Sequence, residues 1–198
     1  MNNISYRILI AGLLGIVTAF LVSSFYNPFQ ESVAHTDDGH SHSDNDKVHV
    51  HADFLFYIQD EQVDLTDDKY QSVEGAVKHL SFHLHDNIGH VLHRHAVDIT
   101  LADFLSSIGF ELTDNCIVHE NGVKYCTDTE NELRLYVNGG IHETPSEYVT
   151  QEGDQILLYY GDPDSSRIAT YLEEITEEAC IYSGTCPLRG TPPPESCG

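Results

Sequence analysis

Phe82–His95 reads FHLHDNIGHVLHRH and contains five of the 13 histidines of the chain. It holds two histidine pairs whose members are two residues apart, and side chains with that spacing on a strand point to the same face of a sheet. The stretch predicts a β-hairpin whose three-residue loop, Asn87-Ile88-Gly89, ends in a glycine with positive φ. In that register one face of the hairpin carries four imidazoles: His83, His85, His93 and His95.

The two faces of this predicted hairpin differ in chemistry. The face opposite the histidines carries Phe82, Leu84 and Leu92, which can pack on a core. A shift of register by one residue would mix the two faces, so the pattern fixes the pairing of His83 with His93. Cross-strand neighbours lie about 5 Å apart at Cβ, so the imidazole face can hold a metal ion.

A second strand is predicted at Val48–Ile58, VHVHADFLFYI, because apolar residues alternate there with a row that begins His49, His51. If this strand lies beside the hairpin, both histidines join the imidazole face. Asp53 and Asp86 are then the candidates for accepting a hydrogen bond from the N–H of a ligand imidazole. A metal site is favoured, and two alternatives remain open: a pH-responsive histidine cluster and a solvated polar face.

Composition narrows the classes of ligand. The chain has 32 Asp and Glu against nine Lys and Arg, a formal net charge of −23. Such acidity excludes nucleic acid as a partner, because a phosphate backbone is bound by Lys and Arg. The negative charge instead favours divalent cations as ligands, or indicates a protein from a high-salt habitat. Since Met1 is the only methionine, the soft ligands that Cu(I) prefers are scarce, and imidazoles point to Zn or Cu(II).

The N-terminal residues predict a membrane anchor. Residues 8–25, ILIAGLLGIVTAFLVSSF, carry no charge, and a run of this length suits a spanning helix (residues 8–26) better than a signal peptide. Arg7, in a cytoplasmic head at residues 1–7, orients the protein with its bulk outside the cytoplasmic membrane. A disordered His/Asp linker is expected at 27–46. Cleavage after Ala34 is the alternative.

Residues 47–178 are predicted to form one extracytoplasmic α+β domain, and 179–198 a Cys/Pro-rich tail. Helices are expected at Thr100–Gly109, which opens with the capping box Thr100 and Asp103, and at Asp164–Glu178, which has an apolar stripe. About 150 residues outside the N-terminal segments are enough for one apolar core.

The five cysteines all lie in the second half of the chain. A hairpin loop centred on Asn121 sets Cys116 opposite Cys126, which predicts a disulfide in an extracytoplasmic protein. The tail is expected to hold one further disulfide and one thiol, with the pairing open among Cys180, Cys186 and Cys197. Catalytic dithiols typically have the Cys-x-x-Cys spacing, which does not occur here.

Two stretches, LRLYVNGG at 133–140 and EGDQILLYYGD at 152–162, resemble the paired end strands of β-grasp domains, and this implies a β-grasp-like mixed sheet. Residues 48–197 also resemble a family of membrane-anchored, His-rich extracytoplasmic proteins from little-studied bacteria and archaea. The motifs that carry this second resemblance are HVHADFLFYI, FHLHDNIGHVLHRHA, TLADFLSSIGF and CPLRGTPPPESC. Some members bear the label protein-disulfide isomerase.

These features predict a single-pass membrane protein whose outer domain binds a divalent transition metal through a His-rich hairpin. A thiol–disulfide protein and a β-grasp module that binds a ligand or a partner are the alternatives. The sequence names no substrate and no protein partner, so no enzymatic activity is assigned.

Overall fold

The central strand of the protein is β1 (Lys47–Ile58), in a computed structural model that describes residues 47–73 and 78–193. It pairs in parallel with β10 (Gln155–Gly161) on one side and antiparallel with β4 (Val91–Ala96) on the other. The order of strands in the larger sheet is β3-β4-β1-β10-β8-β9, and β2 pairs with β1. The remaining strands of this sheet are β2 (Glu61–Gln62), β3 (Phe82–His83), β8 (Glu132–Val137) and β9 (Gly140–His142). The sheet is mixed, as predicted.

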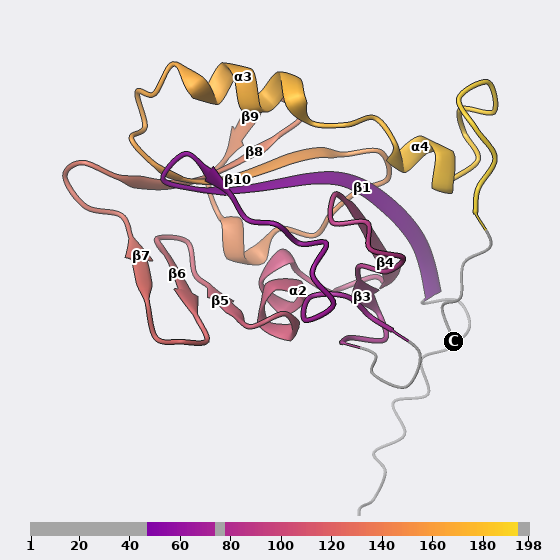
Figure 1. Ribbon diagram of the computed structural model, residues 1–198, viewed down its shortest axis with the longest axis horizontal. Coiled ribbons are helices and arrows are strands. Elements are labelled where there is room, and N and C mark those ends of the chain that lie inside the picture. The colour runs from indigo at the N-terminus through magenta and orange to yellow at the C-terminus, as the bar shows by residue number, and fades with distance from the viewer. Residues whose placement is uncertain (1–46, 74–77, 194–198) are drawn as a thin grey trace, which may run out of the picture. The chain divides into compact units, whose positions relative to one another are not determined.

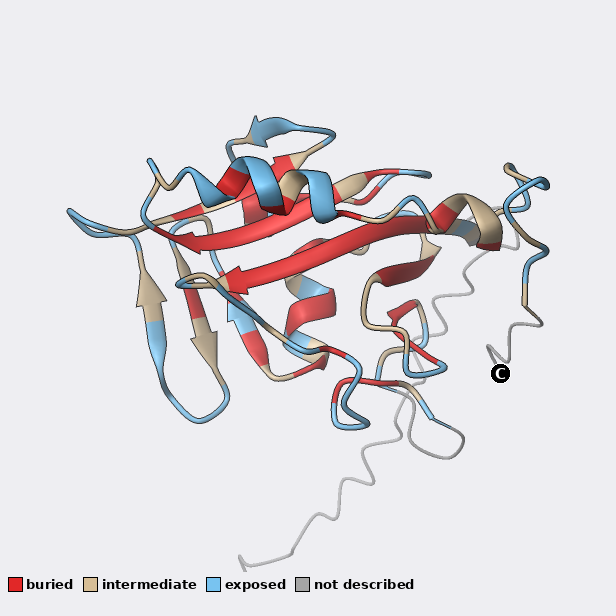
Figure 2. Cartoon of the chain, turned by 45° about the horizontal axis from the view of Figure 1, so that its top comes forward, coloured by how far each residue is buried: buried red, intermediate tan, exposed pale blue. Residues whose placement is uncertain are grey.

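β1 is buried on both of its faces from His51 to Tyr57, and the continuous apolar run Phe54–Ile58 is typical of such a central strand. Ala52, Phe54 and Phe56 point into the main apolar core, whereas Leu55 and Tyr57 belong to a second apolar cluster on the opposite face. Figure 2 shows β1 and β10 buried along most of their length. The same strand therefore faces both layers that cover the sheet.

Helices cover the two faces of the sheet (Figure 1). On one face lies α2 (Leu101–Ser107), whose capping box of Thr100 and Asp103 is present as predicted. Its Phe104 ring packs on Phe54 and Phe82, with centroids 6.1 Å and 5.0 Å away. On the other face lies α3 (Arg167–Glu174), followed by the short α4 (Ala179–Tyr182) beside the first half of β1.

The helix expected at Asp164–Glu178 is shorter than predicted. It ends at Glu174, and the next residue, Ile175, has an extended conformation. The chain leaves the helix there because Thr176 and the backbone N–H of Glu178 hydrogen-bond to Asp53 of β1.

The hairpin of β3 and β4 has the predicted pairing of His83 with His93 but a different loop. The residues with positive φ are Asp86, at 60°, and Asn87, at 59°, and Gly89 is not among them, so the reason given for Gly89 was wrong. Regular pairing stops after His83. Other segments bind the intervening backbone: Ser72 N–H donates to the Leu84 carbonyl and Phe54 N–H of β1 to the His90 carbonyl.

Gly89 is required for another reason. A Cβ on this residue would lie 2.8 Å from the carbonyl carbon of Leu65 and 2.9 Å from the backbone nitrogen of Thr66. The loop therefore packs directly on another segment of backbone, and only a glycine fits without movement.

A separate three-stranded sheet, ordered β5-β6-β7, follows α2. Its strands are β5 (Phe110–Leu112), β6 (Cys116–His119) and β7 (Lys124–Cys126). Cys116 pairs with Cys126 and forms a disulfide with it, which confirms the predicted bridge. A second disulfide joins Cys180 to Cys186, and within the described part of the tail the residues Ala179–Tyr182 form α4, which contacts β1.

The predicted head, membrane anchor and linker, residues 1–46, lie outside the described residues. Within 47–73 and 78–193, no helix has the length and apolar character to cross a membrane.

Candidate metal centre

Six histidines meet on the sheet face that α4 covers, where β1, β4 and the chain that begins at β3 lie side by side. His93 of β4 pairs with His51 of β1 on one side and with His83 of β3 on the other. Ring centroids of contacting histidines are between 4.1 Å apart, for His85 and His93, and 6.1 Å apart, for His83 and His93. We call these six residues the histidine cluster: His49, His51, His83, His85, His93 and His95. The structure thus brings together all six histidines expected from the sequence.

Three members are already close enough to share an ion. One ring nitrogen from each of His49, His51 and His93 lies within 4.8 Å of the others. Nitrogens bound to one tetrahedral Zn(II) at about 2.0–2.1 Å lie about 3.3 Å from each other, so small side-chain rotations would complete the coordination. His95 lies next to this group, with its ring centroid 4.7 Å from that of His49.

Four members of the cluster are buried. The exposed fraction is 1% for His51 and His93, 4% for His83 and 6% for His85. Burial away from water lowers the pKa of His93, and the neighbouring histidines lower it further. His93 is therefore neutral at physiological pH, which is the form that donates a lone pair to a metal ion.

Protein groups orient several of the rings through Nδ1. The Nδ1 of His85 donates to the Asp86 carboxylate at 2.7 Å, the role expected for this aspartate. The Nδ1 of His83 donates to the His79 carbonyl at 2.9 Å. Both rings then carry their lone pair on Nε2. In His85 this atom is buried without a hydrogen-bond partner among the described protein groups, although buried polar atoms normally have one. A metal ion at this position would satisfy it, as in histidine sites whose second nitrogen is held by a carboxylate.

Asp53 differs from its expected role. Instead of accepting from an imidazole, its carboxylate accepts hydrogen bonds from Glu178 N–H at 2.8 Å, from the backbone N–H of Ala179 and from the Thr176 hydroxyl. Burial raises the pKa of Asp53, and these hydrogen bonds oppose that shift. Asp53 therefore fixes the start of α4 to the sheet, next to the cluster.

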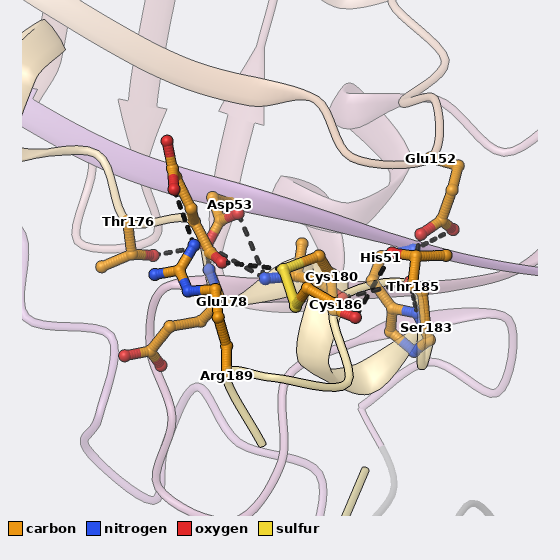
Figure 3. The surroundings of a disulfide bond; sticks show 12 residues. His51, Asp53, Glu152, Thr176, Glu178, Cys180, Ser183, Thr185, Cys186 and Arg189 are labelled. Carbon is orange, nitrogen blue, oxygen red and sulfur yellow. Dashed lines mark hydrogen bonds and ion pairs between the residues drawn. A yellow bond between two sulfur atoms is a disulfide. The ribbon is translucent and has the colours of Figure 1, made fainter. Parts of the chain in front are cut away.

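Tyr182 and Ser183 cover the cluster, and no sequence pattern predicts this contact. The Tyr182 ring centroid lies 5.1 Å from that of His93 and 5.7 Å from that of His51. The Ser183 hydroxyl lies 2.9 Å from His51 Nδ1 and also donates to the Glu152 carboxylate, which in turn accepts from the His51 backbone N–H at 3.0 Å (Figure 3). These residue types are common, and Ser183 lies 132 positions from His51, so no local pattern links them.

Histidines elsewhere in the described residues have ordinary structural contacts. The His90 Nε2 lies 2.8 Å from the Glu178 carboxylate, and the His119 and His142 rings pack against Phe110 and Tyr148. The fourth, His79, accepts a hydrogen bond from Ser81 N–H at its Nδ1 and holds His83 through its backbone carbonyl. Among the described residues, the ring contacts between histidines therefore lie at the three-strand site.

Comparisons with protein-family models, with curated proteins and with solved structures find no match to this chain. We therefore infer the function of the chain from the histidine cluster itself.

Proposed function

We propose that this protein binds a divalent transition metal, Zn(II) or Cu(II), through the histidine cluster. The observation that carries the proposal is the burial of four of the six imidazoles against one another. Buried polar groups lose hydration and are retained at a cost unless they find partners. A metal ion would bind one nitrogen of several imidazoles at once, including the buried Nε2 of His85.

The burial also weighs against the simplest alternative. A solvated polar strand face would leave its imidazoles in water, whereas His51 and His93 are 1% exposed. The Nδ1 contacts of His83 and His85 further support the proposal, because they hold each ring with Nε2 as the ligand atom. With neutral nitrogen ligands and no thiolate in the cluster, the site suits borderline ions rather than Cu(I).

We also propose that the fold is β-grasp-like. The central parallel pair β1 and β10, with β4 next to β1, β8 next to β10 and α2 across one face, supports a β-grasp-like arrangement. In that arrangement the histidine cluster occupies the hairpin side of the sheet, and the covering α4 is an addition at the C-terminal end.

We further propose that the domain lies outside the cytoplasmic membrane. The uncharged run at residues 8–25 supports a single-pass anchor with the domain outside the cytoplasmic membrane, and two disulfides fit an oxidising compartment. Protease added to intact cells should remove the domain, and the mature chain should begin near Met1. A mature soluble chain that begins at His35 would show a cleaved signal peptide instead.

A titration of the purified, metal-free full chain tests the binding function. We expect about one Zn(II) or Cu(II) per chain, with affinity that falls on acidification, because protonated imidazoles do not coordinate. A chain that takes up neither ion at neutral pH would defeat the proposal.

A further inference from the structure

We propose that the Cys180–Cys186 disulfide is a thiol-exchange site that controls a lid over the histidine cluster. The lid is residues 176–189, which include α4. In this proposal, which rests on the proposed metal-binding function, a dithiol reductant opens the lid and so allows the bound ion to exchange.

The lid touches the buried centre of the cluster rather than its rim. Tyr182, itself 9% exposed, packs on both His51 and His93. Ser183 contacts His51 Nδ1 and bonds to the Glu152 carboxylate. Because His51 and His93 are almost fully buried under these residues, an ion cannot reach their nitrogens from this side while the lid is closed.

The lid depends on tethers for its shape. α4 has four residues, too few to persist as an isolated helix in water. One tether is Asp53, which binds the residues just before and at the start of α4. The disulfide acts within the lid: it joins Cys180 in α4 to Cys186 beyond it, closes that loop, and lies between the Asp53 contacts and the His51 contacts (Figure 3).

The disulfide is within reach of a partner thiol. Cys180 and Cys186 help to line a surface pocket of about 460 Å³, together with Glu177 and Arg189, whose side chains form an ion pair with an N···O distance of 2.6 Å. The other disulfide, Cys116–Cys126, lies in the separate three-stranded sheet and provides a matched comparison.

The exchange is an ordinary two-electron reaction. A thiolate of the dithiol attacks one sulfur of the Cys180–Cys186 bond, forming a mixed disulfide and releasing the other cysteine as a thiolate, which takes up a proton. The second thiol of the reductant loses its proton and attacks the mixed disulfide, releasing the remaining cysteine as a thiolate that is protonated in turn. The protein gains two electrons and two protons, and the dithiol is oxidised to its disulfide. The loop from Cys180 to Cys186 is then open, and α4 has lost the cross-link that holds it to the turn that follows.

A labelling experiment tests the lid without any metal. The purified metal-free full chain is treated with diethyl pyrocarbonate, and the modification rate of each histidine is measured by peptide mass spectrometry. In Cys180→Ser/Cys186→Ser, we expect His51 and His93 to be labelled at least about tenfold faster than in the parent chain, with exposed His49 unchanged. The control Cys116→Ser/Cys126→Ser should label like the parent. Equal rates for His51 and His93 in all three chains would overturn the lid.

A chelator experiment tests the coupling to metal. The same three chains are loaded with Zn(II), and transfer of the ion to an excess of chelator is followed. We expect dissociation from Cys180→Ser/Cys186→Ser to be at least about tenfold faster than from the other two chains, in line with the effect of losing partners around a ligand. Equal dissociation rates would overturn the control of ion exchange. If the parent chain binds no ion, the proposed function fails, but the labelling still decides the lid.

Wild-type protein provides a second route if the double serine variant does not fold. Dithiothreitol is added to the folded chain, and the reduced cysteines are identified by alkylation and mapping. Faster labelling of His51 and His93 should appear in step with loss of the Cys180–Cys186 bond. Loss of that bond with unchanged labelling would contradict the proposal.

Discussion

One face of the sheet is covered by α3 at one end and by α4 at the other, and the two ends differ in what they bury. Under α3 lie apolar and aromatic side chains, among them Leu55, Tyr57 and Leu157. Under α4 lie imidazoles, with His51 and His93 at the centre. We call these the apolar end and the histidine end. Both are shielded from water, and β1 contributes to both.

The apolar end and the histidine end differ in what they contribute to the stability of the fold and to the binding of a ligand. Burial of apolar surface stabilises a fold by roughly 25 cal/mol per Å², whereas an imidazole gives up hydration when buried and needs a partner to recover it. The apolar end therefore accounts for the attachment of α3, whereas the histidine end gathers imidazole nitrogens that could bind an ion. We infer that the histidine end is kept for its ligand.

The largest effect should come from removing the central ligands. His51→Ala/His93→Ala deletes two of the three nitrogens that lie within 4.8 Å of one another, so Zn(II) affinity should fall at least about a hundredfold. The matched control is His40→Ala/His42→Ala in the N-terminal segment, which should bind like the parent. Titration of both variants distinguishes them. Loss of binding in the control, with retention in the cluster variant, would place the site elsewhere.

The converse substitution tests the apolar end. Leu157 is fully buried there. Its replacement by alanine should lower the free energy of unfolding by about 2–5 kcal/mol, because the change leaves a cavity. Zinc affinity of the folded variant should be unchanged. Urea unfolding and zinc titration of the same preparation check both points. Weakened zinc binding with intact stability would mean that the two ends are not separable as described.

A smaller loss of stability is expected at Gly89, in the loop that carries His85 and Asp86. Gly89→Ala would bring a Cβ within 3 Å of the Leu65 and Thr66 backbone and should cost about 1–3 kcal/mol in overpacking. Gly140→Ala is the control, since its Cβ would meet no atom nearer than 3.7 Å. Comparable urea midpoints for the two variants would show that the loop yields easily.

The smallest effect concerns pH in the metal-free protein. Burial lowers the pKa of His93 in the folded state below its value of about 6.5 in the unfolded chain. Below pH 6.5 the unfolded state therefore binds a proton that the folded state does not. The contribution of neutral His93 to the free energy of unfolding is therefore fully present above that pH. It falls on acidification, by up to about 1.4 kcal/mol per pH unit.

Urea unfolding between pH 7.5 and 5.0 measures this slope. His93→Gln, which cannot take up the proton, should reduce it, and substitution of the solvent-exposed His49 by Gln serves as the control. An unchanged slope in His93→Gln would assign the acid sensitivity to other groups.

Local patterns in the sequence predicted the parts of the structure that depend on local rules. Strand alternation identified β1, the spacing of histidine pairs gave the register of His83 with His93, and the symmetry about Asn121 gave the Cys116–Cys126 bridge. Each depends on residues close together in the chain. The convergence of His49 and His51 with the hairpin was expected only if β1 lay beside it, which it does.

The remaining features depend on contacts between distant segments. Gly89 was correctly singled out but for the wrong reason, because its constraint comes from the backbone at Leu65. Asp53 was assigned to an imidazole, although its partners Thr176 and Glu178 lie over 120 residues away. α4 is similarly far from β1 in the sequence, so no local pattern predicted that it covers the cluster. Only the folded chain shows these contacts.

X-ray absorption spectroscopy of the zinc-loaded full chain tests the central claim most directly. To exclude ions held near the N-terminus, the chain should carry His40→Ala/His42→Ala. The account predicts one ion with three or four imidazole nitrogens at about 2.0–2.1 Å and no sulfur ligand. A spectrum dominated by carboxylate and water oxygens, without the multiple scattering of imidazole rings, would contradict it.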